Sequence, residues 1–539
     1  MRNIAIITLI IAVIFSSCKK DFLNLAPNEN INEEQAFSTM IQTENFVNNI
    51  YSKLPVAQTR TGDGFTTLDC LSDEGSPTYF QRGKIFNGGG YGPANIQDFI
   101  GDIWGDSFAG IRKTNILLEK LPTVPANNED EAATKKRLKG EALFLRSFLY
   151  FDVLKIYGRF PILDKRLDLN DTYQIPRNKY EECVAFILKD LDEAIAILPA
   201  SYPPNLLGRA NKAMCMALKS RLLLYAASPL NSADSPSKWQ EAAKAAKDLL
   251  DLNQFSLYNN IADKANNYKA IFNVFANNEI IWFMNLGNGK TYEQNYYPIS
   301  SSGWGNISPT QNLVDEYQMA NGKDINDPAS GYNPAKPYVG REPRFYATVW
   351  YNGSIVRSKT IQTFPGGTDA INGGDNNTKT GYYLRKFCDE TINISSGAGR
   401  QMMSIWFRLA EIYLNYAEAS NEANNDPAAD PLIYTYINLI RTRAGLPDLP
   451  TGLSKVQMRL AIRHERRIEL TFEEHRFFDD RRWKLNFGGD IKGIVWDSSS
   501  ANYTITVTEN RPFDTKMWYM PIPQNEINIT RMEQNPGWQ

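Results

Sequence analysis

The sequence predicts a mainly α-helical protein in which a scaffold of helical hairpins carries an irregular, loop-rich subdomain with short strands. Up to about residue 250, apolar residues recur at three- and four-residue steps, as on one face of a helix. From about Asn253, loops rich in Gly, Asn, Pro and Tyr replace this pattern. The 539 residues are 42% hydrophobic and 22% charged, which is ordinary globular composition. Disorder, collagen and coiled coil are therefore excluded as descriptions of the whole chain.

The first residues indicate export and a lipid anchor. Arg2 precedes the apolar run of residues 4–15, which is too short to span a bilayer and is typical of a signal peptide, placed at residues 1–17. Ser16-Ser17-Cys18 resembles a bacterial lipobox, in which Cys18 is acylated, although Phe15 replaces the usual aliphatic residue. Residues 18–32 are then a lipidated flexible tether. An ordinary secretory signal with an incidental cysteine is the alternative.

Helical segments dominate the first half of the chain. We predict helices at residues 33–54, 95–121, 134–157, 178–198 and 212–227, and one that begins at Pro236. Helices of this length with short breaks and alanine-rich inner faces are similar to degenerate tetratricopeptide repeats (TPR). Trp104 is interpreted as a core residue. We divide the folded body into a region with TPR-like helices at 33–300 and a C-terminal region at 301–539, packed together as one body.

In the second half we predict strands at residues 279–285 and 344–351, and helices at 403–422, 430–444 and 454–481. In the last helix, Arg466–Glu469 and Glu473–Arg476 are spaced i,i+3, so charge pairing on a partly buried face is expected.

Four cysteines remain after Cys18: Cys70, Cys183, Cys215 and Cys388. Because two of them fall inside apolar helices, buried free thiols are favoured over two disulfides.

Composition disfavours several function classes. The chain has 58 Lys and Arg against 60 Asp and Glu, so no basic excess exists for nucleic acid. His464 and His475 lie eleven residues apart and cannot hold one ion on one helix face, so neither a metal site nor a cofactor is expected. A structural calcium ion near Asp324 and Asp327 stays open.

Several segments together resemble the SusD/RagB family of outer-membrane nutrient-uptake lipoproteins from Bacteroidetes. They are residues 140–152, 408–419, 437–445, 465–473 and 519–523. The resemblance implies TPR-like helices with a ligand-bearing subdomain and attachment to the outer membrane at the cell surface through Cys18. It also implies a SusC-type TonB-dependent transporter as partner, glycans or peptides as ligands, and no enzymatic activity.

Two loops combine aromatic side chains with amides, acids and arginines, the groups that hold sugars. In the loop of residues 69–95, the resemblance implies an acid, an arginine, an aromatic and an asparagine as ligand-binding residues, and Tyr79 adds a second aromatic. In the loop of residues 292–304, it implies aromatic rings that stack on the ligand. The candidates are Asp73, Tyr79, Arg82, Tyr91, Asn95, Tyr296, Tyr297 and Trp304. The alternative for each aromatic ring is an anchor that packs its loop on the body.

We therefore predict a non-catalytic, lipid-anchored surface protein that captures an oligosaccharide and delivers it to a SusC-type transporter. Peptide uptake is the alternative within the family. A pure TPR-like assembly scaffold is one alternative outside it. The other is a glycoside hydrolase, which needs two carboxyl groups about 5–10 Å apart across a sugar-binding cleft.

Overall fold

A computed structural model describes residues 32–539 except 57–59, 62–65, 80, 169 and 234. The predicted signal peptide (1–17), Cys18 and all of the predicted tether except residue 32 lie outside the described residues. Among the described residues, no helix is long and apolar enough to cross a membrane.

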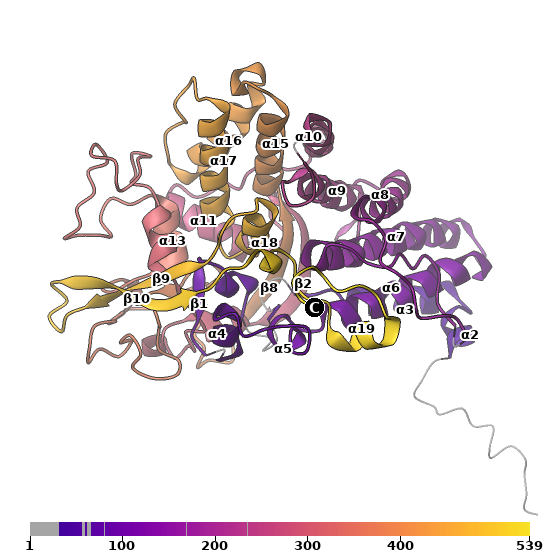
Figure 1. The fold of residues 1–539 in the computed structure, drawn as a ribbon, viewed down its shortest axis with the longest axis horizontal. Helices are drawn as coiled ribbons and strands as arrows, with labels where there is room; N and C mark the ends of the chain where they lie inside the picture. The colour runs from indigo at the N-terminus through magenta and orange to yellow at the C-terminus, as the bar shows by residue number, and fades with distance from the viewer. Residues whose placement is uncertain (1–31, 57–59, 62–65, 80, 169, 234) are drawn as a thin grey trace, which may run out of the picture.

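The predicted mainly helical fold is confirmed (Figure 1). Helices of the first half stack in chain order, each against its neighbour: α6 on α7, α7 on α8, α8 on α9, and α9 on α10. Their bounds are α2 Glu33–Ala36, α3 Met40–Tyr51, α4 Gln81–Asn87, α5 Gln97–Ile100, α6 Ile103–Lys120, α7 Glu129–Tyr157, α8 Tyr180–Ile197, α9 Lys212–Ala227 and α10 Pro236–Leu250. The layer continues through α15 (Leu409–Ala423), which packs on α10 and α9.

Helices of the second half are shorter on average and connect through long loops. They are α11 Lys264–Asn273, α12 Thr291–Tyr296, α13 Gln311–Glu316, α14 Pro343–Thr348, α15 Leu409–Ala423, α16 Leu432–Ala444, α17 Lys455–Glu469, α18 His475–Arg482 and α19 Gln524–Thr530. Strands form separate antiparallel pairs: β1 Gly75–Pro77 with β3 Ile307–Pro309, β2 Ile280–Gly289 with β8 Arg400–Arg408, β4 Val349–Trp350 with β7 Tyr383–Leu384, β5 Ile355–Val356 with β6 Lys359–Thr360, and β9 Gly489–Trp496 with β10 Tyr503–Arg511.

Three of the predicted elements of the second half are wrong in part. Residues 344–348 are helical, because Pro343 starts α14 at the position where proline favours a helix. Residues 403–408 belong to β8, whose buried side chains do not alternate with exposed ones and so hide the strand period. The predicted helix 454–481 breaks after Glu469, where Phe472 and Glu474 adopt left-handed backbone angles of 59° and 64° in φ.

The core joins the two predicted regions. The largest buried cluster contains Trp104 and Phe148 from the first region and Trp406 and Phe477 from the second. Trp104 is 2% exposed, which confirms its interpretation as a core residue. Cys70, Cys183, Cys215 and Cys388 are buried thiols outside any disulfide, as predicted.

A buried network of arginines and glutamates ties α17 to its neighbours. Glu469 bonds Arg408 at 2.6 Å and Arg344 at 3.0 Å, and it also bonds Arg443. The expected partners of the i,i+3 pairs are wrong, although the buried ion-pair helix itself is confirmed. Arg466 bonds Asp479, Glu473 bonds Arg408 and Lys386, and Arg476 bonds Asp73. Tertiary packing places a different partner against each side chain than helix spacing alone does.

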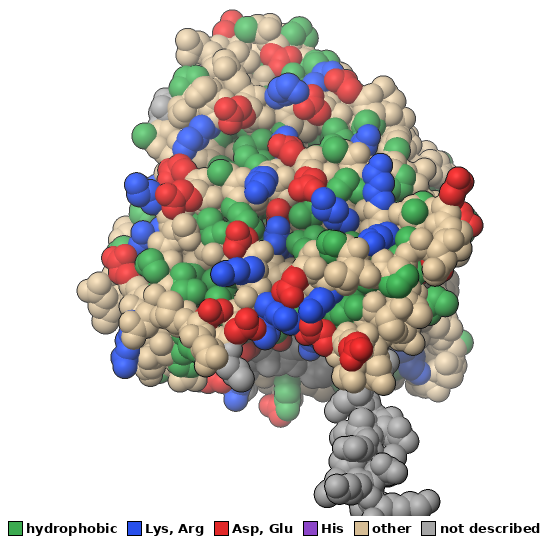
Figure 2. All heavy atoms as spheres, turned by 90° about the vertical axis from the view of Figure 1, so that its right-hand side faces the viewer, with side chains coloured by type: hydrophobic (Ala, Val, Ile, Leu, Met, Phe, Trp, Pro, Cys, Tyr) green, Lys and Arg blue, Asp and Glu red, His purple; other side chains and the backbone are tan. Residues whose placement is uncertain are grey.

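Figure 2 shows the face over the stacked helices, at the right-hand side of Figure 1. Basic and acidic side chains are interspersed there among apolar ones, and no extended patch of one sign covers the described part of this face. The mixture agrees with the nearly neutral composition. This face therefore offers no continuous basic track of the kind that binds nucleic acid.

Candidate functional site: a polar cavity and two exposed aromatic rings

The two loops predicted to bind ligand meet through one short strand pair. β1 belongs to the first loop, and β3 directly follows the second. Their pairing runs from Gly75 opposite Pro309 to Pro77 opposite Ile307, and the Thr78 amide extends it by donating to the Asn306 carbonyl at 3.0 Å. Tyr79 follows directly, and Trp304 lies two residues before Asn306. Both aromatic candidates therefore emerge at the same end of the pair.

These two rings are exposed. Tyr79 is 62% exposed and Trp304 is 38% exposed, which is unusual for large aromatic side chains. They stay candidates for stacking on a ligand.

Hydrogen bonds to the backbone of residues 294–297 hold the segment that carries Trp304. The amides of Trp304, Gly305 and Asn306 donate to the carbonyls of Gln294, Tyr297 and Asn295 at 2.8 to 3.0 Å. Only glycine fits at two neighbouring positions. A Cβ atom at residue 303 would lie 2.1 Å from the Tyr297 carbonyl oxygen, and Gly305 has a φ of 53° and packs against the Tyr383 ring. Trp304 is thus carried on a loop whose path is fixed by contacts to α12.

Tyr296 and Tyr297 are both fully buried, which corrects the expectation that they stack on a ligand. Tyr297 donates its hydroxyl to the Asp389 carbonyl at 2.6 Å, and its ring lies edge-on to Trp350. Tyr91 is also buried and stacks on Phe86 at 4.1 Å, so it anchors its loop and presents no face to a ligand. For these three residues the alternative reading, a loop anchor, is the one that the packing supports.

The polar candidates of the first loop have internal partners. Asp73 bonds Arg476 at 2.8 Å and Arg467 at 2.9 Å. Burial by itself would raise the pKa of Asp73, but the two guanidinium groups lower it far below its ordinary value. Asn95 accepts from the Gly92 amide at 2.8 Å and so closes its own turn. Arg82 is exposed and lies 3.4 Å from Asp98, which leaves it the most accessible of the three.

A cavity of about 460 Å³ opens where the first loop, the loop of residues 363–381 and the β9–β10 hairpin converge. Its volume lies in the range of small-ligand sites. Polar side chains dominate its wall: Ser76, Lys84, Asn372, Lys379, Thr506, Thr508, Glu509 and Asn510. We call it the polar cavity. Such a wall suits a ligand with many hydroxyl groups, since it offers both donors and acceptors.

Electrostatics of the polar cavity favour neutral or weakly acidic ligands. Lys84 and Lys379 both line the cavity. Burial and the nearby charge of Lys84 lower the pKa of Lys379. Glu509 is the single carboxylate among the described wall residues, and it pairs with Arg511 at 2.5 Å.

Sequence reasoning missed the part of the polar cavity that the hairpin contributes. The run Thr504-Ile505-Thr506-Val507-Thr508 alternates polar and apolar residues and could have indicated β10. No local signal places this hairpin beside residues 76–88, which lie more than 400 positions earlier.

Asp324 and Asp327, the candidate calcium ligands, have partners within their own loop. Asp327 lies 3.4 Å from Lys323, and Asp324 accepts from the Asn326 amide at 2.7 Å. Throughout the described parts of the chain, no group of three or more His, Cys, Asp or Glu is arranged to hold a metal ion. A structural calcium ion near Asp324 and Asp327 therefore stays a prediction.

The fold is that of a known protein family. Residues 269–538 match the SusD family, and residues 21–224 match a family described as starch-binding associating with outer membrane. The chain belongs to the SusD family, which confirms the resemblance stated from the sequence.

Solved and curated relatives agree. The chain is similar to the crystal structure of a SusD-like protein from Bacteroides fragilis, with 30% identity and a TM-score of 0.81 over 95% of this chain and 100% of that one. It is also similar to a SusD-like protein of Formosa agariphila, with 25% identity over 80% of this chain and 77% of the relative. A SusD-like protein of Bacteroides ovatus is 22% identical over 90% of this chain and 83% of its own length.

Proposed function

We propose that this protein binds an oligosaccharide in the polar cavity, with Tyr79 and Trp304 as stacking platforms. The observation that carries the proposal is the convergence of three separate segments on the polar cavity, together with two exposed aromatic rings in the loops that the β1–β3 pair joins. Sugars present hydroxyl groups at their edges and C–H groups on their faces, so they need both kinds of partner. The starch-binding description of the matched family supports the same ligand class.

The proposal extends to capture at the cell surface and delivery. Acylation of Cys18 would hold the protein at the outer membrane, with which the matched family is described as associating. A SusC-type TonB-dependent transporter is the proposed receiver of the ligand. Peptide uptake is the competing reading, and the binding experiment below distinguishes the two.

Binding without catalysis is part of the proposal. Burial raises the pKa of Asp69 to about 6 and that of Glu474 to about 8, as a general acid would require. Both carboxyl groups are buried in the body and do not line the polar cavity. The cavity itself offers Glu509, so the paired carboxylates of a glycoside hydrolase find no support there.

Isothermal titration calorimetry tests the proposal. The purified protein is titrated with panels of oligosaccharides and peptides, alongside Trp304→Ala and the control Tyr173→Ala, which removes a similarly exposed aromatic ring from the 163–178 segment. We expect saturable oligosaccharide binding that weakens about tenfold or more in Trp304→Ala, equivalent to about 1.4 kcal/mol, and is unchanged in Tyr173→Ala.

Two results would contradict the proposal. Binding of peptides but of no oligosaccharide would establish the competing reading. Oligosaccharide binding that Trp304→Ala leaves intact would remove the stacking role of this ring and the assignment of the site.

A further inference from the structure

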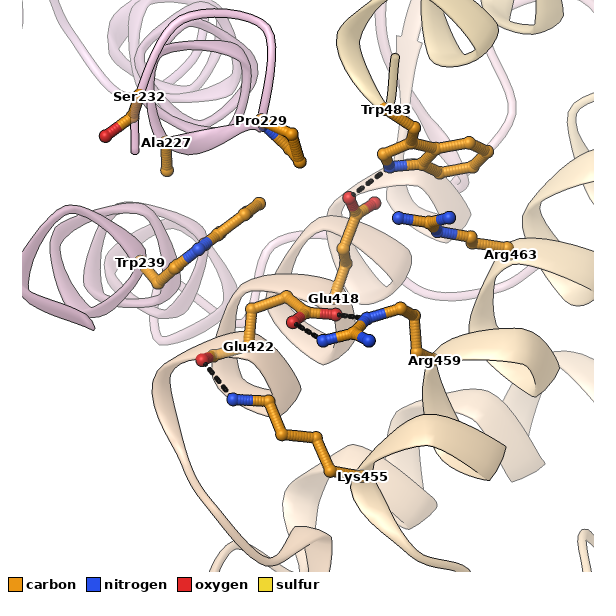
Figure 3. A pocket seen from close by; sticks show the side chains of 10 residues that line it. All are labelled: Ala227, Pro229, Ser232, Trp239, Glu418, Glu422, Lys455, Arg459, Arg463 and Trp483. Atoms are coloured by element: carbon orange, nitrogen blue, oxygen red, sulfur yellow. Dashed lines mark hydrogen bonds and ion pairs between the residues drawn. The ribbon is translucent and has the colours of Figure 1, made fainter. Parts of the chain in front are cut away.

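A second cavity, of about 360 Å³, lies between α10, α15 and α17. Figure 3 shows its wall: Trp239 projects from one side, and Arg463 and Trp483 project from the other toward the same space. Pro229 and Ser232 close it from the α9–α10 connection. We call it the tryptophan cavity. It is built from elements that contribute nothing to the polar cavity.

The charged groups of this cavity are paired, with one exception. Arg459 bonds Glu422 through two contacts, and the Lys455 ammonium donates to the Glu422 carbonyl at 2.8 Å. Glu418 accepts from Arg482 and, at 2.7 Å, from the Trp483 indole. Both glutamates of the wall are thus already committed to other cations or donors.

Arg463 is the exception. Its guanidinium carbon lies 4.4 Å from the centre of the Trp483 ring, and its Nε is buried with no hydrogen-bond acceptor in the described structure. Burial and the nearby charges of Arg482 and Arg459 lower the pKa of Arg463, against the opposing charges of Glu418 and Glu422. Stacking on the ring occupies a face of the guanidinium plane and leaves its in-plane N–H groups for a ligand.

The remaining wall narrows the ligand class. A guanidinium edge matches a carboxylate, which accepts two parallel hydrogen bonds from it. The ring of Trp239 and the Pro229 ring offer apolar surface opposite, and Lys455 and Arg459 add polar groups to the wall. A uronic acid has all three complementary features: one carboxylate, a face of C–H groups and several hydroxyls.

We infer that the tryptophan cavity is a second binding site, specific for a carboxylated sugar whose carboxylate bonds Arg463. The inference does not depend on the polar cavity, since none of the residues that carry it touches that site.

Calorimetry with three small probes tests the site on the purified full chain. Glucuronate carries the carboxylate and the sugar ring, glucose carries the ring alone, and acetate carries the carboxylate alone. For a ligand of this size we expect glucuronate to bind with a Kd of about 1 mM, and glucose and acetate to bind at least about tenfold more weakly.

Variants then locate the binding. Arg463→Gln is expected to weaken glucuronate binding about tenfold or more, since a charge-assisted bidentate contact is lost. Arg112→Gln removes the same charge from the exposed side of α6 and is the matched control. Trp304→Ala is expected to leave glucuronate binding unchanged.

The inference is overturned if glucuronate does not bind, if acetate binds as tightly as glucuronate, or if Arg463→Gln binds it normally while thermal unfolding shows all variants folded. If glucuronate fails to bind while oligosaccharides still bind in a Trp304-dependent manner, only this inference falls, and the proposed function stands.

Discussion

Glu474 shows how the fold controls the charge of a single side chain. It lies at the break between α17 and α18 with both carboxyl oxygens buried. Among the described residues these oxygens have no hydrogen-bond donor, and the Arg60 Nε lies 3.7 Å away. Burial raises the pKa of Glu474 to about 8, against the opposing charges of Arg60 and Lys155. At neutral pH the group is therefore mostly protonated in the folded protein.

This protonation predicts a pH-dependent stability. The folded pKa of Glu474 lies above its unfolded value of 4.5, so the folded state holds an extra proton between the two values. The contribution of this group to the free energy of unfolding therefore falls as pH rises from about 5 to about 8. We expect Glu474→Gln, which is always neutral, to gain stability relative to the unsubstituted protein across that range, measured by urea unfolding.

Glu181→Gln, on the exposed side of α8, is the control and should track the unsubstituted protein. A difference between Glu474→Gln and the unsubstituted protein that is the same at both ends of the pH range would show that Glu474 does not titrate there.

At the scale of elements, the break between α17 and α18 connects the body to the candidate site. The Phe472 amide donates to Glu74 at 2.9 Å, and the Glu474 amide donates to Asp69 at 3.0 Å. Both acceptors lie in the first ligand loop, on either side of Asp73. The turn that ends α17 therefore helps to hold that loop in place, in addition to the Arg467 and Arg476 contacts to Asp73.

The buried network at the end of α17 predicts a large effect of a small substitution. Glu469→Gln removes the charge that Arg344, Arg408 and Arg443 share and leaves buried cations without a full counterion. We expect a loss of about 3–5 kcal/mol in the free energy of unfolding, measured by urea titration. Asp248→Asn removes one partner of the exposed Lys244–Asp248 pair on α10 and should cost less than about 1 kcal/mol. Equal costs for the two variants would argue against a structural role of the network.

At the scale of the whole molecule, strand pairing and the core cross the boundary predicted at residue 300. β1 pairs with β3, and β2 pairs with β8, so each pair takes one strand from either side. The largest core cluster likewise draws on both sides.

We therefore expect that neither residues 33–300 nor residues 301–539 fold when produced alone. Each would leave β-strand edges unpaired and expose one side of the shared core. Circular dichroism of each fragment should show weak secondary structure and no cooperative thermal unfolding, whereas the full chain unfolds cooperatively. A fragment that unfolds cooperatively on its own would establish an independent domain.

The helical scaffold was predictable from the sequence because its signal is local. Residues 212–227 were predicted as a helix and form α9 with the same bounds, since the apolar spacing lies within the segment and the Asn211 cap and Pro229 lie directly beside it. The family was also recognisable from short signature segments. The secondary structure of segments 344–348 and 403–408 was not predictable, because runs that are buried on both sides lack a period that distinguishes a strand from a helix.

The choice among aromatic candidates depended on tertiary structure alone. Tyr296, Tyr297 and Trp304 lie within the same segment of residues 292–304, yet the first two are buried and the third is exposed. Likewise, the polar cavity joins Lys84 to Lys379 and Thr506, and the tryptophan cavity joins Trp239 to Arg463. Local periodicity determines whether a segment is helical, but the direction of a side chain and its distant neighbours are set by packing between segments, which no local pattern encodes.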